Sequence, residues 1–203
     1  MENTKKFIGL KDVILVTLLT AICIVIVTIV VLPFMANIKL VLWVVSGIEM
    51  LPCGPVYMLM VAKAPRYGTQ LLFSFLFAIY YFITNGMLSI SLMIFLIGVV
   101  RELLMLQGGY RSIPRLTASY ALFGVGVMLS PVLLIVASKD SMIQTMVDAG
   151  MNQEYIDTVF AVYSGQNIAI GIVITILGAV LGSLLGYRMI RKHFAPAGVV
   201  GEA

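Results

Sequence analysis

"VILVTLLTAICIVIVTIVVLP", residues 13 to 33, contains no charged side chain, and this stretch decides the fold class. A helix that crosses the hydrocarbon core of a bilayer needs about 20 predominantly apolar residues, and the stretch supplies them. The whole chain has the same character, because 61% of its 203 residues are hydrophobic and only 11% are charged. Soluble domains carry roughly 25% charged residues. The sequence therefore predicts an integral membrane protein built from α-helices.

Further apolar segments follow along the chain, separated by polar or glycine-containing connections. The predicted spans are residues 13–33, 39–61, 67–84, 88–106, 116–137 and 165–190. At this chain length, a single integral membrane domain over residues 1–203 is the natural interpretation. We therefore expect an all-α membrane protein whose six transmembrane helices form one bundle.

The basic residues are distributed unevenly over the connections between these spans. Only Lys39 and Lys139 fall on one side of the membrane. The other side receives eleven of the thirteen Lys and Arg residues: Lys5, Lys6, Lys11, Lys63, Arg66, Arg101, Arg111, Arg115, Arg188, Arg191 and Lys192. Cytoplasmic loops carry an excess of Lys and Arg. Both termini are therefore predicted to be cytoplasmic, in a multi-pass protein of a prokaryotic plasma membrane.

The longest connection, residues 138–164, is predicted to lie outside and to form two short amphipathic helices. The first has apolar residues at helical spacing: Met142, Met146 and Val147. Asp140 and Ser141 are its N-cap candidates, and Gly150 is expected to end it. The second is expected to begin at Asn152, with one apolar face. That face contains Tyr155, Ile156, Val159, Phe160 and Tyr163.

Two placements of these outer helices remain open. They can cover the outer surface of the bundle as a lid, or they can rest on lipid headgroups as interfacial helices. Acidic residues in this segment favour the lid, because anionic headgroups would repel them: Asp148, Glu154 and Asp157.

The segment "GIEMLPCGPVYMLM", residues 47–60, places a carboxylate and two prolines inside the second span. Glu49 lies roughly 15 Å along this helix, where an unpaired charge is expensive. Pro52 and Pro55 each remove a backbone donor, so a broken helix that lines a cavity is predicted. A protonated Glu49 bonded to a neighbouring helix, with a plain proline kink, is the structural alternative.

Other polar and aromatic residues are predicted to gather at the same outer level as Glu49. Together with Glu49 they form the predicted substrate-binding set: Trp43, Tyr80, Asn85, Tyr163, Gln166 and Asn167. Aromatic residues at this level are often only interfacial belt residues, and the two amides can also serve as helix caps. Near the inner end of the fourth span, Arg101 is expected to extend to the cytoplasm or to form a structural pair with Glu102.

Small residues recur along the last span, with Gly178, Gly182 and Gly186 at four-residue spacing. Such a ridge lets another helix approach closely, and this helix can belong either to the same chain or to another subunit. Thr17 and Ala21 form a weaker version in the first span. All five residues are candidates for a subunit interface.

Several kinds of chemistry are not expected from this sequence. The only histidine is His193, in the C-terminal tail, so no Ser–His or Cys–His nucleophile pair is available within the spans. No P-loop is present, and neither a disulfide framework nor a zinc pattern is visible. We therefore expect that the chain is not an enzyme, that it has no resident cofactor or metal, and that it does not bind nucleic acid.

Three stretches carry a resemblance to a known family: "KKFIGLKDVILVTLLTAI", "LPCGPVYMLMVAKAPRYGTQ" and "GGYRSIPRLTASYALF". They resemble the Trep/Strep, or MptD-like, group of substrate-binding (S) subunits of energy-coupling factor (ECF) transporters. The resemblance implies an S subunit that captures a vitamin or related small metabolite outside the cell. It implies partners as well: a T subunit and two cytoplasmic ATPase subunits, which alone use ATP.

The resemblance also implies where partners and ligand bind. The first helix of such subunits offers an A-x-x-x-A patch to the T subunit, and the matching positions here are Thr17 and Ala21. The ligand normally lies among the outer loops and the fourth to sixth helices, which agrees with Gln166 and Asn167 but less well with Glu49.

Alternative functions remain open at this point. A haem-specific S subunit is one, because Tyr, Met and Cys can ligate iron, although Gly54 separates Cys53 from Pro55 and no Cys-Pro motif results. A stand-alone secondary transporter is another, although no inverted repeat is evident.

Overall fold

The computed structural model describes residues 7–34, 37–106 and 108–194, and within these ranges the chain is almost entirely helical, with no strand. The main helices are α1 (Leu10–Val31), α3 (Ser46–Lys63), α4 (Thr69–Asn85), α5 (Leu88–Leu104), α6 (Ile113–Ala137), α7 (Lys139–Asp148), α8 (Gln153–Val162) and α9 (Gly165–Met189). Short elements join or extend them: η1 (Leu32–Phe34), α2 (Ile38–Leu40), η2 (Val41–Val45), η3 (Gly109–Arg111) and η4 (Ile190–Phe194). The predicted helical fold class is confirmed.

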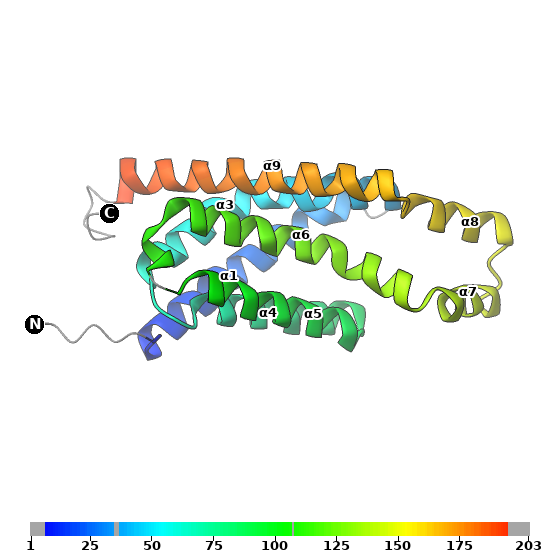
Figure 1. Cartoon of the computed structure of the whole chain (residues 1–203), viewed down its shortest axis with the longest axis horizontal. Helices are drawn as coiled ribbons and strands as arrows, with labels where there is room; N and C mark the ends of the chain where they lie inside the picture. Colours follow the sequence, from blue (N-terminus) through cyan, green and yellow to red (C-terminus); the bar gives the residue numbers. More distant parts are fainter. Residues whose placement is uncertain (1–6, 35–36, 107, 195–203) are drawn as a thin grey trace, which may run out of the picture.

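The long helices lie side by side along one axis and alternate in direction (Figure 1). α1 begins and α9 ends at the same end of the bundle, which we call the termini end. α7 and α8 lie at the opposite end, which we call the α7–α8 end. The basic residues at the helix ends follow this division, because Lys63 and Arg188 belong to the termini end and Lys39 and Lys139 to the other.

Three helical segments are long and apolar enough to cross a membrane: Leu10–Phe34, Ile113–Ala137 and Gly165–Lys192. The remaining helices are shorter. α4 and α5 have 17 residues each, hence a length of about 26 Å, slightly less than the roughly 30 Å hydrocarbon core. The structure thus supports a membrane protein with at least these three candidate spans, while the count of six stays a prediction.

The predicted break at Pro52 and Pro55 is wrong, because α3 runs through both prolines without interruption. The irregular turn lies earlier, in the π-helical segment η2. Pro55 has no N–H group, so the Leu51 carbonyl oxygen receives no helical hydrogen bond. The backbone of Gly182 in α9 packs against this oxygen. A neighbouring backbone therefore covers the carbonyl that the proline leaves open, and the helix continues.

α3 and α9 pack backbone against backbone, and glycines make this close approach possible. A Cβ at Gly178 would overlap the Gly47 carbonyl oxygen, and a Cβ at Gly182 would overlap that of Met50. Gly186 packs in the same way on Gly54 and Pro55. The sequence left open whether the partner of the glycine ridge belongs to the same chain or to another subunit. In the structure the partner is α3 of the same chain, and the glycine Cα–H groups face its carbonyl oxygens.

α1 packs one face on the bundle and leaves the other uncovered. Its buried residues are Asp12, Val16, Thr20, Cys23 and Val27. Thr17 and Ala21 lie on the exposed side, among large apolar residues such as Leu18 and Val25. An ion pair between Asp12 and Arg66 fastens the start of α1 to the connection between α3 and α4.

The outer helix pair predicted for residues 138–164 is confirmed, with two corrections. Gly150 has a φ of 77° after α7, and the Asn152 side chain caps α8 by accepting from the Tyr155 N–H at 2.8 Å. However, α7 begins at Lys139, so Asp140 and Ser141 lie inside it and do not cap it. Tyr155 is 54% exposed and so does not belong to the buried face of α8. That face consists of Ile156, Val159 and Val162.

Candidate functional site

Glu49 is a buried carboxyl group in the first turns of α3, and only 3% of the residue is exposed. No hydrogen bond or ion pair to its side chain occurs among the described residues. Tyr81 of α4, Tyr120 of α6 and Cys53 of α3 lie within its electrostatic range. Glu49 of α3 therefore lies within electrostatic reach of hydroxyl groups on α4 and α6, and it has no ion-pair partner among the described residues.

Trp43 lies in the π-helical segment η2, about two turns before Glu49. Its indole Nε1–H is buried and has no acceptor among the described residues. The ammonium group of Lys39 lies 4.5 Å from the ring centroid. An indole N–H normally finds a partner when buried, so this donor, which has none among the described residues, is a candidate ligand-binding group.

Tyr163 belongs to the same neighbourhood as Trp43. Both side chains pack against an apolar cluster formed by Leu42, Met128, Val132 and Val162. Burial raises the pKa of the Tyr163 hydroxyl. Trp43 and Tyr163 are therefore brought together from η2 and from the end of α8.

Gln166 and Asn167, at the start of α9, have different surroundings. The Asn167 amide donates to the carbonyl oxygens of Val162 at 2.9 Å and Ala161 at 3.4 Å, so it caps the end of α8. Gln166 is exposed. In this structure Asn167 therefore acts as a helix cap, which was one of the two roles considered for it.

Tyr80 and Asn85 complete the predicted set. The Tyr80 hydroxyl lies 3.0 Å from the Thr28 hydroxyl of α1, and its ring contacts that of Tyr81. Tyr80 is therefore on the same side of the bundle as Glu49, away from Trp43 and Tyr163. Asn85 ends α4, but its side chain lies outside the described residues. The predicted residues thus fall into two groups, one around Glu49 and one around Trp43.

Thr175 is a polar residue of α9 that the sequence interpretation passed over. Its hydroxyl is buried and has no hydrogen-bond partner among the described residues. Gly171 packs on Leu42 and Gly178 on Gly47, which places Thr175 level with the junction of η2 and α3. An isolated threonine in an apolar span carries no signal by itself, so only the structure shows that it is unpartnered.

Arg101 of α5 is placed differently from the expectation that it extends to the cytoplasm. It does not extend to the cytoplasm, because its exposed fraction is 0%. Its guanidinium donates to the Ser119 carbonyl oxygen at 2.9 Å, to the Ser74 hydroxyl at 2.7 Å and to the Gln70 side-chain oxygen at 2.7 Å. The rings of Phe73 and Phe123 lie 5.1 and 4.7 Å from the guanidinium carbon. Small residues such as Gly98, packed on Ser74, let the helices close around it.

Glu102, the neighbour of Arg101, has a separate role. One carboxylate oxygen accepts from the backbone N–H groups of Gln70 and Leu71, at 3.0 and 3.2 Å, and so caps the first turn of α4. The other accepts from the Tyr110 hydroxyl at 2.9 Å. A carboxylate at a helix N-terminus is a favourable arrangement. Glu102 is therefore structural and does not neutralise Arg101 directly.

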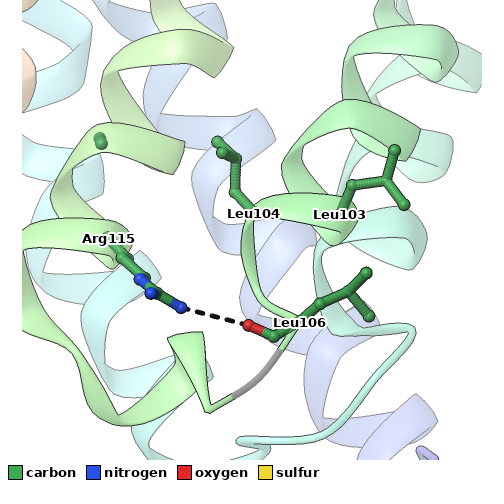
Figure 2. A pocket seen from close by; sticks show the side chains of 5 residues that line it. Leu103, Leu104, Leu106 and Arg115 are labelled. Atoms are coloured by element: carbon green, nitrogen blue, oxygen red, sulfur yellow. Dashed lines mark hydrogen bonds between the residues drawn. The ribbon is translucent and has the colours of Figure 1, made fainter.

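One hollow on the surface is separate from both groups of predicted site residues. Leu103, Leu104, Leu106, Arg115 and Ala118 line it, between the end of α5 and the first turns of α6 (Figure 2). It lies at the termini end, whereas Trp43 and Tyr163 lie towards the α7–α8 end. The buried groups that have no partner among the described residues, those of Glu49, Trp43 and Thr175, all lie away from this hollow and remain the candidates for ligand contact.

The long apolar helices and the scarcity of charged residues define an integral membrane protein. A family described as "Hypothetical bacterial integral membrane protein (Trep_Strep)" matches residues 10–195, and the chain belongs to this family. No curated protein and no solved structure matched the chain in the corresponding comparisons.

Proposed function

We propose that the chain is the substrate-capturing membrane subunit of an energy-coupling factor importer. In this function it binds a micronutrient, such as a vitamin or a related small metabolite, from outside the cell. A T subunit and two cytoplasmic ATPase subunits then complete the transport. Membership of a bacterial integral membrane protein family is compatible with this function, and the resemblance of the three sequence stretches gives it a specific form.

The observation that carries the proposal is Glu49. A buried carboxyl group in a membrane helix is costly unless a partner compensates it, and such groups are functional-site candidates by default. Glu49 has no such partner among the described residues. A ligand that carries a cation or a hydrogen-bond donor would provide one. Trp43 on η2 and Thr175 on α9 carry further buried polar groups that have no partner among the described residues, and they form a second candidate region apart from Glu49.

The outer helix pair supports ligand capture at this end. Val162 of α8 packs into the cluster that also contains Leu42 and Met128, against which Trp43 lies. The pair is therefore attached to the protein through its apolar face, as a lid would be. Removal of a lid exposes the polar groups beneath it, and its closure excludes water.

The arrangement of the helices is compatible with six spans and both termini in the cytoplasm. α1 begins and α9 ends at one end of the bundle (Figure 1), and the basic residues gather at that end. In this orientation the α7–α8 end faces outwards. The uncovered side of α1 with Thr17 and Ala21 is then available to the T subunit.

Purification of the tagged chain from its native membrane tests this function. An importer subunit should bring with it one further membrane protein and two ATPases, and the complex should hydrolyse ATP. Mass spectrometry of small molecules in the same preparation should identify the ligand. Full uptake by cells that lack the T and ATPase subunits would contradict the proposal and assign the chain to the secondary transporters.

A further inference from the structure

The hollow between α5 and α6 combines apolar walls with one basic side chain. Three leucines from the end of α5 and the turn that follows, with Ala118 of α6, form the walls, and the volume is about 440 Å³. This volume lies within the roughly 300–1,000 Å³ of typical small-molecule sites. Leu103, Leu104 and Leu106 are all exposed, so the hollow opens to the surroundings of the bundle.

Arg115 stands at the edge of this hollow. Its guanidinium donates one hydrogen bond, at 3.2 Å, to the Leu106 carbonyl oxygen (Figure 2). No other hydrogen bond or ion pair of this side chain occurs among the described residues. The carbonyl therefore orients the guanidinium, while the remaining N–H groups stay available to an anion, and guanidinium groups bind phosphate well.

The surroundings of Arg115 favour an anionic and partly apolar occupant. Arg111 lies in the same connection and is exposed. The nearby carboxylate of Glu102 is already engaged by Tyr110 and the start of α4. Along α5, the exposed residues Leu96, Val100 and Leu103 continue the apolar surface away from the hollow. A phosphate at Arg115 and an acyl chain along α5 would match both parts.

We propose that this hollow binds an anionic phospholipid, with the headgroup phosphate on Arg115 and one acyl chain along α5. Basic pockets between transmembrane helices bind anionic headgroups in this way. The proposal concerns the lipid partner of the chain and does not depend on transport, because it rests only on the hollow, its charge and the membrane location.

Spin-labelled phosphatidylglycerol and phosphatidylcholine with the same acyl chains test the proposal in bilayers that contain the full chain. We expect the protein to prefer phosphatidylglycerol about fivefold, the value of one basic side chain near an anionic partner. Arg115→Gln should reduce the preference towards one. Ala118→Phe keeps the charge but fills the hollow, so it should also reduce the preference. Lys139→Gln, at the α7–α8 end, is the matched control and should leave it unchanged.

Three outcomes would overturn the proposal. An unchanged preference in both Arg115→Gln and Ala118→Phe, with unchanged thermal unfolding in phosphatidylcholine, shows that the hollow holds no anionic lipid. Competition by millimolar inorganic phosphate that abolishes the preference shows an ion site without a lipid chain. Loss of a co-purifying protein in Arg115→Gln, with lipid preference retained, assigns the hollow to a polypeptide partner.

Discussion

Arg101 of α5 and Gln70 of α4 are joined by a 2.7 Å hydrogen bond from the guanidinium to the amide oxygen. The other end of the same amide donates to the Tyr57 hydroxyl of α3 at 2.9 Å. Gln70 therefore links a buried cation to a third helix. Ser119 extends the connection to α6, so one guanidinium organises four helices near the termini end.

Replacement of this cation should destabilise the bundle. Arg101→Met keeps an apolar stem but leaves the Gln70 oxygen buried without a donor, and a lost partner of this kind costs about 1–3 kcal/mol. We expect a lower midpoint of thermal unfolding in detergent. Arg101→Lys should restore only part of the loss, because an ammonium lacks the planar fork. Arg188→Met, at an exposed position, is the control. Equal midpoints for wild type and Arg101→Met would contradict the structural role.

Glu49→Gln should weaken ligand binding while it preserves shape. If the Glu49 carboxylate forms a charge-assisted hydrogen bond to the ligand, its loss costs roughly 1.5–3 kcal/mol, or about ten- to a hundred-fold in affinity. Titration of the metabolite that co-purifies with the wild-type chain measures this. Glu154→Gln on the exposed side of α8 is the control. Unchanged affinity in Glu49→Gln would remove Glu49 from the site and favour the region around Trp43.

Gly182→Ala should disrupt the contact between α3 and α9. Its new Cβ would overlap the Met50 carbonyl oxygen, which belongs to the backbone and cannot rotate away. Overpacking typically costs about 1–3 kcal/mol, and Gly182→Leu should lower folded yield further. Gly165→Ala is the matched control, since no atom lies within 4 Å of its Cβ position. Wild-type stability of Gly182→Ala would show that the helices can separate without cost.

Both termini are predicted to be cytoplasmic because of the distribution of Lys and Arg. Reporter fusions at the two ends measure this directly, with an alkaline phosphatase that is active outside and a fluorescent protein that folds inside. We expect fluorescence at both ends. Phosphatase activity at either end would contradict the six-span arrangement.

The exposed side of α1 is predicted to contact the T subunit. Ala21→Trp adds a bulky ring there without a clash in the bundle, because Ala21 is exposed. We expect unchanged thermal unfolding but loss of the co-purifying subunits. Val136→Trp, which is 72% exposed on α6, is the control. Co-purification that survives Ala21→Trp would move the docking surface elsewhere.

The helical fold class could be predicted from the sequence because apolar runs of this length admit few other structures. Local signals also worked for the outer helices, since Gly150 and Asn152 act through their own backbone and side chain. The interpretation of Pro55 as a helix break failed, because the backbone that covers the freed Leu51 carbonyl comes from Gly182, more than a hundred residues later. The failure at Arg101 has the same cause, since its acceptors lie on α4 and α6.

The candidate site was only partly accessible to sequence reasoning. Depth along a helix follows from counting residues, so Glu49 could be recognised as a buried carboxyl. The direction in which a side chain points could not be predicted, because all faces of these helices are apolar and periodicity gives little information. The sequence therefore grouped Tyr80 with Trp43, whereas the structure places Tyr80 beside α1 and Trp43 beside α6 and α8.

The glycine contacts between α3 and α9 also limit how these two helices can move. A contact made of backbone atoms has no rotamers, so it cannot adjust by degrees. A shift of α9 by one residue would bring the side chain of Ala179 or Ser183 to a place that admits only hydrogen. The next matching position lies one four-residue repeat away, about 6 Å along the axis. α3 and α9 therefore form a rigid pair with a fixed register, and we expect the two helices to move as one body in any motion of the protein.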